Sequence, residues 1–114
     1  MGKIEIGEYI KDIFGRIGKV YVYDCGTYRT KKFGASSGEI VKHSKNIIDL
    51  IEVGDYVNGE RVFATDNRIN DNGEKVVLAE NYDEWTDDGV IANKDIKSIV
   101  TKEQFSQMEY RLED

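Results

Sequence analysis

The amino-acid sequence predicts an all-β fold. Three observations support this class: a seven-residue segment occurs twice, short apolar runs alternate with polar residues, and eleven glycines supply turns in a chain without proline. The 114 residues are 39% hydrophobic and include seven Tyr, four Phe and one Trp. This composition is sufficient for a core that needs neither a metal nor a disulfide.

The clearest feature is an internal repeat, which indicates two structural units of the same kind. The segment IEIGEYI at 4–10 matches IEVGDYV at 51–57 position by position, with only like-for-like changes. In each copy a turn and a further apolar run follow, so each predicts strand, turn, strand. Gly7 and Gly54 stand at the same place in the two copies and suit a bend in a strand.

A weaker repetition closes each copy. Two extended runs end at a hydroxyl residue: 38–43 before Ser44, and 95–100 before Thr101. Ser and Thr are common helix N-caps, and Gln104 gives Thr101 the spacing of a capping box. We therefore expect a short helical joint at 47–50 and a helix after Thr101.

One hairpin is also indicated. The unbroken apolar run from Val76 to Ala79 predicts a central strand that is apolar on both faces. The tripeptide Asp71-Asn72-Gly73 is a tight-turn signal and should join this strand to one near 61–67.

Short strands, glycine turns and one-turn helices favour small barrels over a sandwich. We expect two tandem SH3-like modules, at 1–49 and 50–105, followed by a C-terminal tail at 106–114. The alternative is one fused barrel-like sheet with a shared core, because a barrel of about 45 residues is marginal by itself. In both arrangements we expect extensive contact between the copies.

The charge is unevenly distributed along the chain. The net charge is −6, yet residues 1–48 carry nine Lys/Arg against five Asp/Glu, whereas residues 49–114 carry seven against seventeen. Such a chain is a poor candidate for binding bulk DNA. The lone Cys25 and the lack of a secretory leader indicate the cytosol of a bacterial host, and no apolar stretch is long enough to span a membrane.

Catalytic chemistry has little support. The single His43 and the single Cys25 lie in no recognisable motif, so we expect no catalytic residue and no enzyme activity. No His/Cys cluster is present, and the segment 66–71 lacks the ligand spacing of a calcium loop. We expect no metal and no cofactor.

The acidic segment 80–88 is the main candidate site. Its candidate partner-binding residues are Glu80, Tyr82, Asp83, Glu84, Trp85, Asp87 and Asp88. Five carboxylates around two aromatic rings, with no Lys or Arg between them, are typical of a patch that docks on a basic surface. In the alternative interpretation Trp85 fills the core and the acidic residues form a solvated loop.

A second candidate site, for a nucleotide or another small ligand, is both aromatic and basic. It consists of Tyr21, Tyr23, Tyr28, Arg29, Lys31 and Lys32. Stacking on the rings and contacts with phosphate would hold the ligand, and the planar fork of Arg29 is the most specific element. The alternative is an edge strand that its charges protect from pairing. The repeated Tyr9 and Tyr56 are expected to have a shared packing role.

The segments 38–59 and 95–110 resemble a group of uncharacterised proteins encoded by phages and prophages of clostridia and related Gram-positive bacteria. The resemblance covers about half of the chain and transfers no catalytic residue. It implies that the protein acts by binding, as an inhibitor of host defence or as a regulator.

The leading hypothesis is a non-catalytic phage-associated protein. It would block a host macromolecule, such as a CRISPR-type nucleic-acid-handling defence complex, through its acidic aromatic surface. The partner would be a host protein with a basic surface, and exposed barrel edges would allow a homodimer. The alternatives are a module that sequesters a nucleotide or small ligand, and a regulatory nucleic-acid-binding protein.

Overall fold

The computed structural model describes residues 3–108, apart from the side chains of 66, 67 and 106–108. The strands are β1 (Tyr9–Asp12), β2 (Ile17–Lys19), β3 (Val22–Asp24), β4 (Thr27–Arg29), β5 (Gly34–Ser36), β6 (Ile40–Ser44), β7 (Tyr56–Val57), β8 (Glu60–Ile69), β9 (Lys75–Asp83), β10 (Asp88–Ala92) and β11 (Ile99–Val100). The helical elements are the 3₁₀ turns η1 (Ser37–Glu39), η2 (Ile47–Leu50) and η3 (Asn93–Asp95), and the helix α1 (Lys102–Met108). Most of the predicted tail, 109–114, lies outside the described residues.

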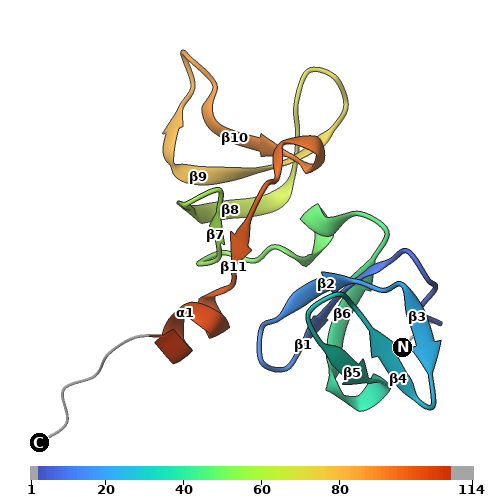
Figure 1. Ribbon diagram of the computed structural model, residues 1–114. Coiled ribbons are helices and arrows are strands. Elements are labelled where there is room, and N and C mark those ends of the chain that lie inside the picture. Colours follow the sequence, from blue (N-terminus) through green and yellow to red (C-terminus); the bar gives the residue numbers. More distant parts are fainter. Residues whose placement is uncertain (1–2, 109–114) are drawn as a thin grey trace, which may run out of the picture.

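The described strands form three open antiparallel sheets. Their strand orders are β2-β1-β6, β3-β4-β5 and β10-β9-β8-β7-β11. The first two sheets belong to the first copy of the repeat and the third to the second copy, and the two copies lie side by side (Figure 1). The all-β class is confirmed. No sheet of the described part closes on itself, so the SH3-like barrel stays a prediction.

Both copies use the same strand order. The first strand of each copy lies between the second and the last, as β1 does between β2 and β6, and β7 between β8 and β11. The register also agrees, because Tyr9 pairs with Ser44 and Tyr56 pairs with Val100. Ser44 therefore corresponds to Val100, one residue before the helix cap at Thr101.

The two 3₁₀ turns before the last strands are also equivalent. The Glu39 carboxylate accepts the backbone N–H of Ser36 (3.0 Å), and the Asp95 carboxylate accepts the backbone N–H of Ala92 (3.4 Å). Glu39 and Asp95 are therefore counterparts. This structural alignment is displaced by one residue from the sequence match of 38–43 with 95–100.

The bend in the seven-residue repeat is the same in both copies. Gly7 and Gly54 have φ values of +98° and +99°, where a residue with a side chain is strained. The N–H of Gly7 donates to the carbonyl of Val20 (2.8 Å), and that of Gly54 donates to the carbonyl of Val62 (2.9 Å). Val20, which directly follows β2, and Val62 on β8 are therefore counterparts.

Each copy has its own hydrophobic core, so the predicted alternative of one shared core is wrong for the described residues. The first cluster consists of Ile4, Ile10, Val20, Ala35 and Ile40, with Tyr28 and Phe33 packed against it. The second consists of Ile48, Ile51, Val57, Val62, Val77, Ala79 and Ile91, with Ile96 and Ile99 against it. The predicted helical joint is confirmed as η2, and its Ile48 belongs to the second cluster.

The predicted hairpin is confirmed. Strand β9 lies between β8 and β10, and the turn that joins β8 to β9 contains Gly73 at φ +79°. Val77 and Ala79 belong to the second core, whereas Val76 and Leu78 are buried on the other face of the strand. The strand is therefore apolar on both faces, as the sequence indicates.

The repeated tyrosines occupy equivalent positions and have different partners. Both rings are half-buried. The Tyr56 ring stacks on Phe105 of α1, with ring centroids 4.9 Å apart, whereas the Tyr9 ring lies 5.9 Å from the ammonium group of Lys19. Both rings pack against a neighbour, but the expected shared role does not extend to a shared partner.

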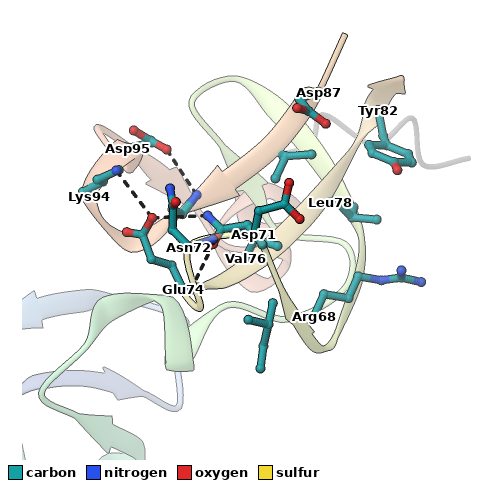
Figure 2. Close-up of a pocket in the computed structure, with 14 residues that line it drawn as sticks. Arg68, Asp71, Asn72, Glu74, Val76, Leu78, Tyr82, Asp87, Lys94 and Asp95 are labelled. Carbon is teal, nitrogen blue, oxygen red and sulfur yellow. Dashed lines mark hydrogen bonds and ion pairs between the residues drawn. The ribbon is translucent and has the colours of Figure 1, made fainter. Parts of the chain in front are cut away.

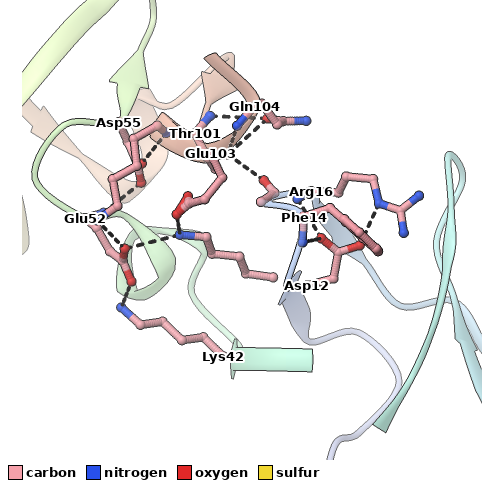
Figure 3. Close-up of polar contacts among 12 residues, drawn as sticks. Asp12, Phe14, Arg16, Lys42, Glu52, Asp55, Thr101, Glu103 and Gln104 are labelled. Carbon is pink, nitrogen blue, oxygen red and sulfur yellow. Dashed lines mark hydrogen bonds and ion pairs between the residues drawn. The ribbon is translucent and has the colours of Figure 1, made fainter. Parts of the chain in front are cut away.

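The two copies meet through a polar cluster (Figure 3). The Lys11 side chain is only 3% exposed, and its Nζ lies 3.0 Å from Glu103 Oε1 and 3.3 Å from Glu52 Oε1. Glu52 also binds Lys102 (2.8 Å) and Lys42 (2.6 Å). These hydrogen bonds, first from Lys102 and then from Lys42, lower the pKa of Glu52 to about 2.

The helix α1 is attached to the same cluster. Asp55 is fully buried and accepts the backbone N–H groups of Lys102 (2.9 Å) and Glu52 (2.8 Å), while its burial raises its pKa. The predicted capping box is confirmed, because Thr101 and Gln104 each bind the other's backbone N–H at 3.2 Å. The Thr101 hydroxyl also donates to the carbonyl of Gly15 in the first copy (2.7 Å).

Candidate protein-binding surface

The segment 80–88, here called the acidic hairpin, forms the end of β9, the connecting turn and the start of β10. Trp85 lies in this turn, and its side chain is 88% exposed. The interpretation in which Trp85 fills a core is therefore wrong. A large apolar ring held this far into solvent gains nothing from the fold and is available to a partner.

Local hydrogen bonds fix the shape of the acidic hairpin. Asp83 Oδ1 accepts the backbone N–H of Trp85 (2.8 Å), and the Asp83 carbonyl accepts the N–H of Asp87 (2.8 Å). Asp87 has φ +60°, and Gly89 follows at φ +77° with its Cα against the backbone of Tyr82, where a Cβ would clash at 2.6 Å. The turn that presents Trp85 is thus specified by its own residues.

Most carboxylates of the acidic hairpin face solvent without a cation. Within residues 3–108 no ion pair involves Asp83, Glu84, Asp87 or Asp88, and all four residues are exposed. Glu80 differs, because Arg61 on β8 binds it at 2.9 Å. The segment contains no Lys or Arg, but the neighbouring strand supplies one, so Glu80 is the least available of the predicted residues.

A second aromatic pair lies beside the acidic hairpin. The Tyr82 ring is 39% exposed and its centroid lies 6.4 Å from that of Phe63, which is 45% exposed. Phe63 is not among the residues that the sequence predicts for this surface. Its position between the buried Val62 and Ala64 was the available signal, because strand alternation places it on the outer face.

The acidic hairpin borders a cavity of about 500 Å³, here called the acidic groove. Its floor is the outer face of β9 and β10, with Val76 and Leu78 from one strand and Val90 and Ala92 from the other. Tyr82 and Asp87 lie at one end of the groove, whereas Glu74, Lys94 and Asp95 lie at the other (Figure 2). The floor is apolar and the ends are charged.

The rim of the acidic groove carries more negative than positive charge. The carboxylates are Asp71, Glu74, Asp87 and Asp95, and the cations are Arg68 and Lys94. Lys94 lies 3.5 Å from Glu74, so this cation is already paired. The hydrogen bond from Asn70, with the charge of Lys94, lowers the pKa of Glu74. Sequence analysis found only the turn here, because the groove exists only after the hairpin folds.

The second candidate site is divided by the fold. Tyr23 and Tyr28 face each other across β3 and β4 with ring centroids 4.6 Å apart, and Tyr28 packs on the first core. Neither they nor Arg29 lines the cavity described above or the two cavities of the first copy and its border with the second. In contrast, the remaining three residues, Tyr21, Lys31 and Lys32, line one cavity of about 540 Å³.

The lone Cys25 and His43 occupy separate environments. Cys25 is exposed in the turn between β3 and β4, with φ +50°. His43 Nδ1 lies 3.0 Å from Oε1 of Glu8, the residue that precedes β1. A hydrogen bond from the Glu5 backbone, followed by that with His43, lowers the pKa of Glu8. Among the described residues no group of three or more His, Cys, Asp or Glu is arranged to hold a metal ion.

Comparison of the chain with protein-family models, with curated proteins and with solved structures found no match. The resemblance to phage-encoded proteins stays an expectation. No helix within residues 3–108 is long and apolar enough to cross a membrane.

Proposed function

We propose that the protein is a non-catalytic binding protein that docks on a basic surface of a host macromolecule through the acidic hairpin and the acidic groove. The observation that carries the proposal is the 88% exposure of Trp85 among carboxylates that have no cation within the described part. Exposed tryptophan is the residue type most enriched at binding hot spots, and surrounding charges of one sign steer an oppositely charged partner.

The acidic groove supports the same kind of partner. An apolar floor formed by Val76 and Leu78 suits the aliphatic stems of Lys and Arg side chains, while Asp71 and Asp87 on the rim suit their charged ends. A basic protein segment would therefore lie in the groove and contact Trp85 beyond its end. From the resemblance to phage proteins we infer that the partner is a host component that handles nucleic acid, since such components carry basic surfaces.

The proposal is tested by affinity capture of host proteins and by a defined probe. The purified protein is used to capture proteins from bacterial lysate at 50 and 200 mM NaCl, and a fluorescent peptide of alternating Lys, Arg and Leu serves as the probe in anisotropy titrations. We expect Trp85→Ala to weaken the peptide's binding about tenfold. The double variant Glu84→Gln/Asp88→Asn should weaken binding of the peptide more than Trp85→Ala does, and its affinity should depend less on the salt concentration.

The matched control is Asp24→Asn/Glu60→Gln, which removes two exposed carboxylates outside this surface. It should bind the probe, and the captured partner, within twofold of the unmodified protein. Equal losses in the two double variants would mean that only net charge matters and would refute a defined surface. Unchanged binding of the peptide by Trp85→Ala would show that Trp85 is not a binding hot spot and would refute that part of the proposal.

A further inference from the structure

A second surface of the molecule has the opposite charge. The cavity of about 540 Å³ in the first copy is lined by Ile6, Ile17, Lys19, Tyr21, Lys31 and Lys32, among others. A cavity of about 400 Å³ adjoins it, because both are lined by Ile17 and Lys32, and the second one extends to Phe33, Ile96 and Lys97 between the two copies. We call these two adjoining cavities the basic groove.

The basic groove is positively charged throughout. Its charged side chains are Arg16, Lys19, Lys31, Lys32 and Lys97, and no carboxylate lines either cavity. Within the described residues Lys19, Lys31, Lys32 and Lys97 take part in no ion pair. Only Arg16 of the five is paired, with Asp12, so four cations of the groove have no counter-charge within the described residues, in a protein whose net charge is −6. They form a positively charged strip that an anion would neutralise.

Aromatic and apolar side chains lie between these cations. The Tyr21 side chain is 57% exposed at the first cavity, and Ile6 beside it is 64% exposed. At the second cavity the guanidinium of Arg16 lies over the Phe33 ring at 4.7 Å. Only its Nε is bound, to Asp12 at 2.6 Å, and no hydrogen bond in the described part uses its two Nη atoms. A stacked guanidinium with free donors is suited to phosphate.

We infer that the basic groove binds single-stranded nucleic acid. Charge complementarity selects a polyanion, and the exposed ring of Tyr21 provides a surface on which a base stacks. The cations line both of the adjoining cavities and do not surround one point. They are therefore spaced to contact successive phosphates of a strand, and the two cavities have room for more than one nucleotide. Because stacking and phosphate contacts are available to every base, we expect the binding to have little sequence preference.

The test measures the anisotropy of fluorescein-labelled octathymidylate against the full chain at 50 and 200 mM NaCl. We expect a dissociation constant in the micromolar range at the lower salt. If four of the five cations meet phosphates, the affinity should fall about 50-fold between the two salt concentrations. Lys31→Glu/Lys32→Glu should weaken binding at least tenfold, and Tyr21→Ala about fivefold or more.

Matched controls keep the outcome specific. Lys3→Glu/Lys45→Glu makes the same charge change on exposed residues of the first copy that do not line the groove, and Tyr23→Ala removes a ring that is 54% exposed outside it. Both variants should bind the octamer with a dissociation constant within threefold of that of the unmodified protein. Thermal unfolding of each variant checks that the fold is intact, which the exposure of all six residues favours.

Three results would overturn the inference. The first is no saturable binding up to about 100 μM protein at 50 mM NaCl, and the second is an equal loss in the control variants. The third is thymidine monophosphate binding as tightly as the octamer, which would replace the strand by a free nucleotide. The variant Glu84→Gln/Asp88→Asn should bind the octamer at least as well as the unmodified protein. The nucleic-acid proposal and the proposal of an acidic docking surface can therefore fail independently of each other.

Discussion

Replacing Glu52 by Gln tests the polar cluster that joins the two copies. Glu52 receives the ammonium groups of Lys11, Lys42 and Lys102 at 3.3, 2.6 and 2.8 Å. Gln is nearly isosteric and cannot ionise, so the substitution reproduces the protonated state of Glu52 at every pH. It therefore converts the pKa shift into a measurable change in the free energy of unfolding.

The magnitude follows from the pKa of Glu52, which falls from 4.5 to about 2 in the folded protein. One pKa unit corresponds to about 1.4 kcal/mol, so the full shift corresponds to about 3 kcal/mol. The side chain of Glu52 is 27% exposed, and solvent screening reduces the effect. We expect Glu52→Gln to lower the free energy of unfolding by about 2 kcal/mol at pH 7.

The effect should depend on pH in a defined direction. Because the pKa of Glu52 is lowered by folding, its contribution is complete above pH 4.5 and is lost as the pH falls toward 2. Burial raises the pKa of Asp55, so this residue makes stability depend on pH in the opposite direction. Its contribution is the same in Glu52→Gln and in the unmodified protein, and it cancels in their difference. The difference between Glu52→Gln and the unmodified protein should therefore shrink between pH 4.5 and pH 2.

Urea denaturation followed by circular dichroism between pH 7 and pH 3 measures this difference. The matched control is Glu60→Gln, because Glu60 is exposed and forms no ion pair within the described residues. It should change the free energy of unfolding by less than about 0.5 kcal/mol. Equal effects of the two substitutions at pH 7, or a gap that stays constant down to pH 3, would refute the reasoning.

Two further substitutions examine how the last strand of the second copy and α1 are held. Asn58→Ala should cost about 2 kcal/mol in urea denaturation: its side chain binds the backbone of Asp95 (2.8 Å), Lys97 (2.7 Å) and Ser98 (3.1 Å), and its φ of +54° disfavours Ala. The exposed Asn81 is the control, and an equal cost of Asn81→Ala would contradict this role. Thr101→Val should cost about 1 to 2 kcal/mol and reduce the helical signal in circular dichroism, because it removes the cap of α1 and the bond to the Gly15 carbonyl, whereas Thr101→Ser should retain both. Unchanged stability in Thr101→Val would mean that α1 is held by other contacts.

The features that the sequence predicts correctly are local in the chain. Gly7 and Gly54 indicate the same bend because only glycine tolerates their φ values. The turn at Gly73 depends on residues within a few positions of it. The Thr101 cap likewise depends on Gln104, three residues away. Each of these signals is complete within a short window, so periodicity and turn chemistry are sufficient to find it.

The features that the sequence did not reveal join distant segments. Lys11 is a charged residue in a short strand, and its burial depends on Glu103, which is 92 residues further along the chain. Arg61 reaches Glu80 only because β8 pairs with β9. The exposure of Trp85 was undecided for a related reason, since composition does not show whether a ring at a turn folds back onto the sheet.

The two copies differ in length at two places. Gly7 and Val20 are 13 residues apart and their counterparts Gly54 and Val62 are 8 apart, and a larger difference follows the second strand, with a consequence for how the surface can change. Val20 and Glu39 are 19 residues apart, whereas their counterparts Val62 and Asp95 are 33 apart, which gives the second copy 14 additional residues there. That interval contains β9, the acidic hairpin and most of the acidic groove. The paired first and last strands are common to both copies and lie outside it. New binding specificity can therefore arise by exchange of this interval, while the framework of paired strands that the two copies share stays the same.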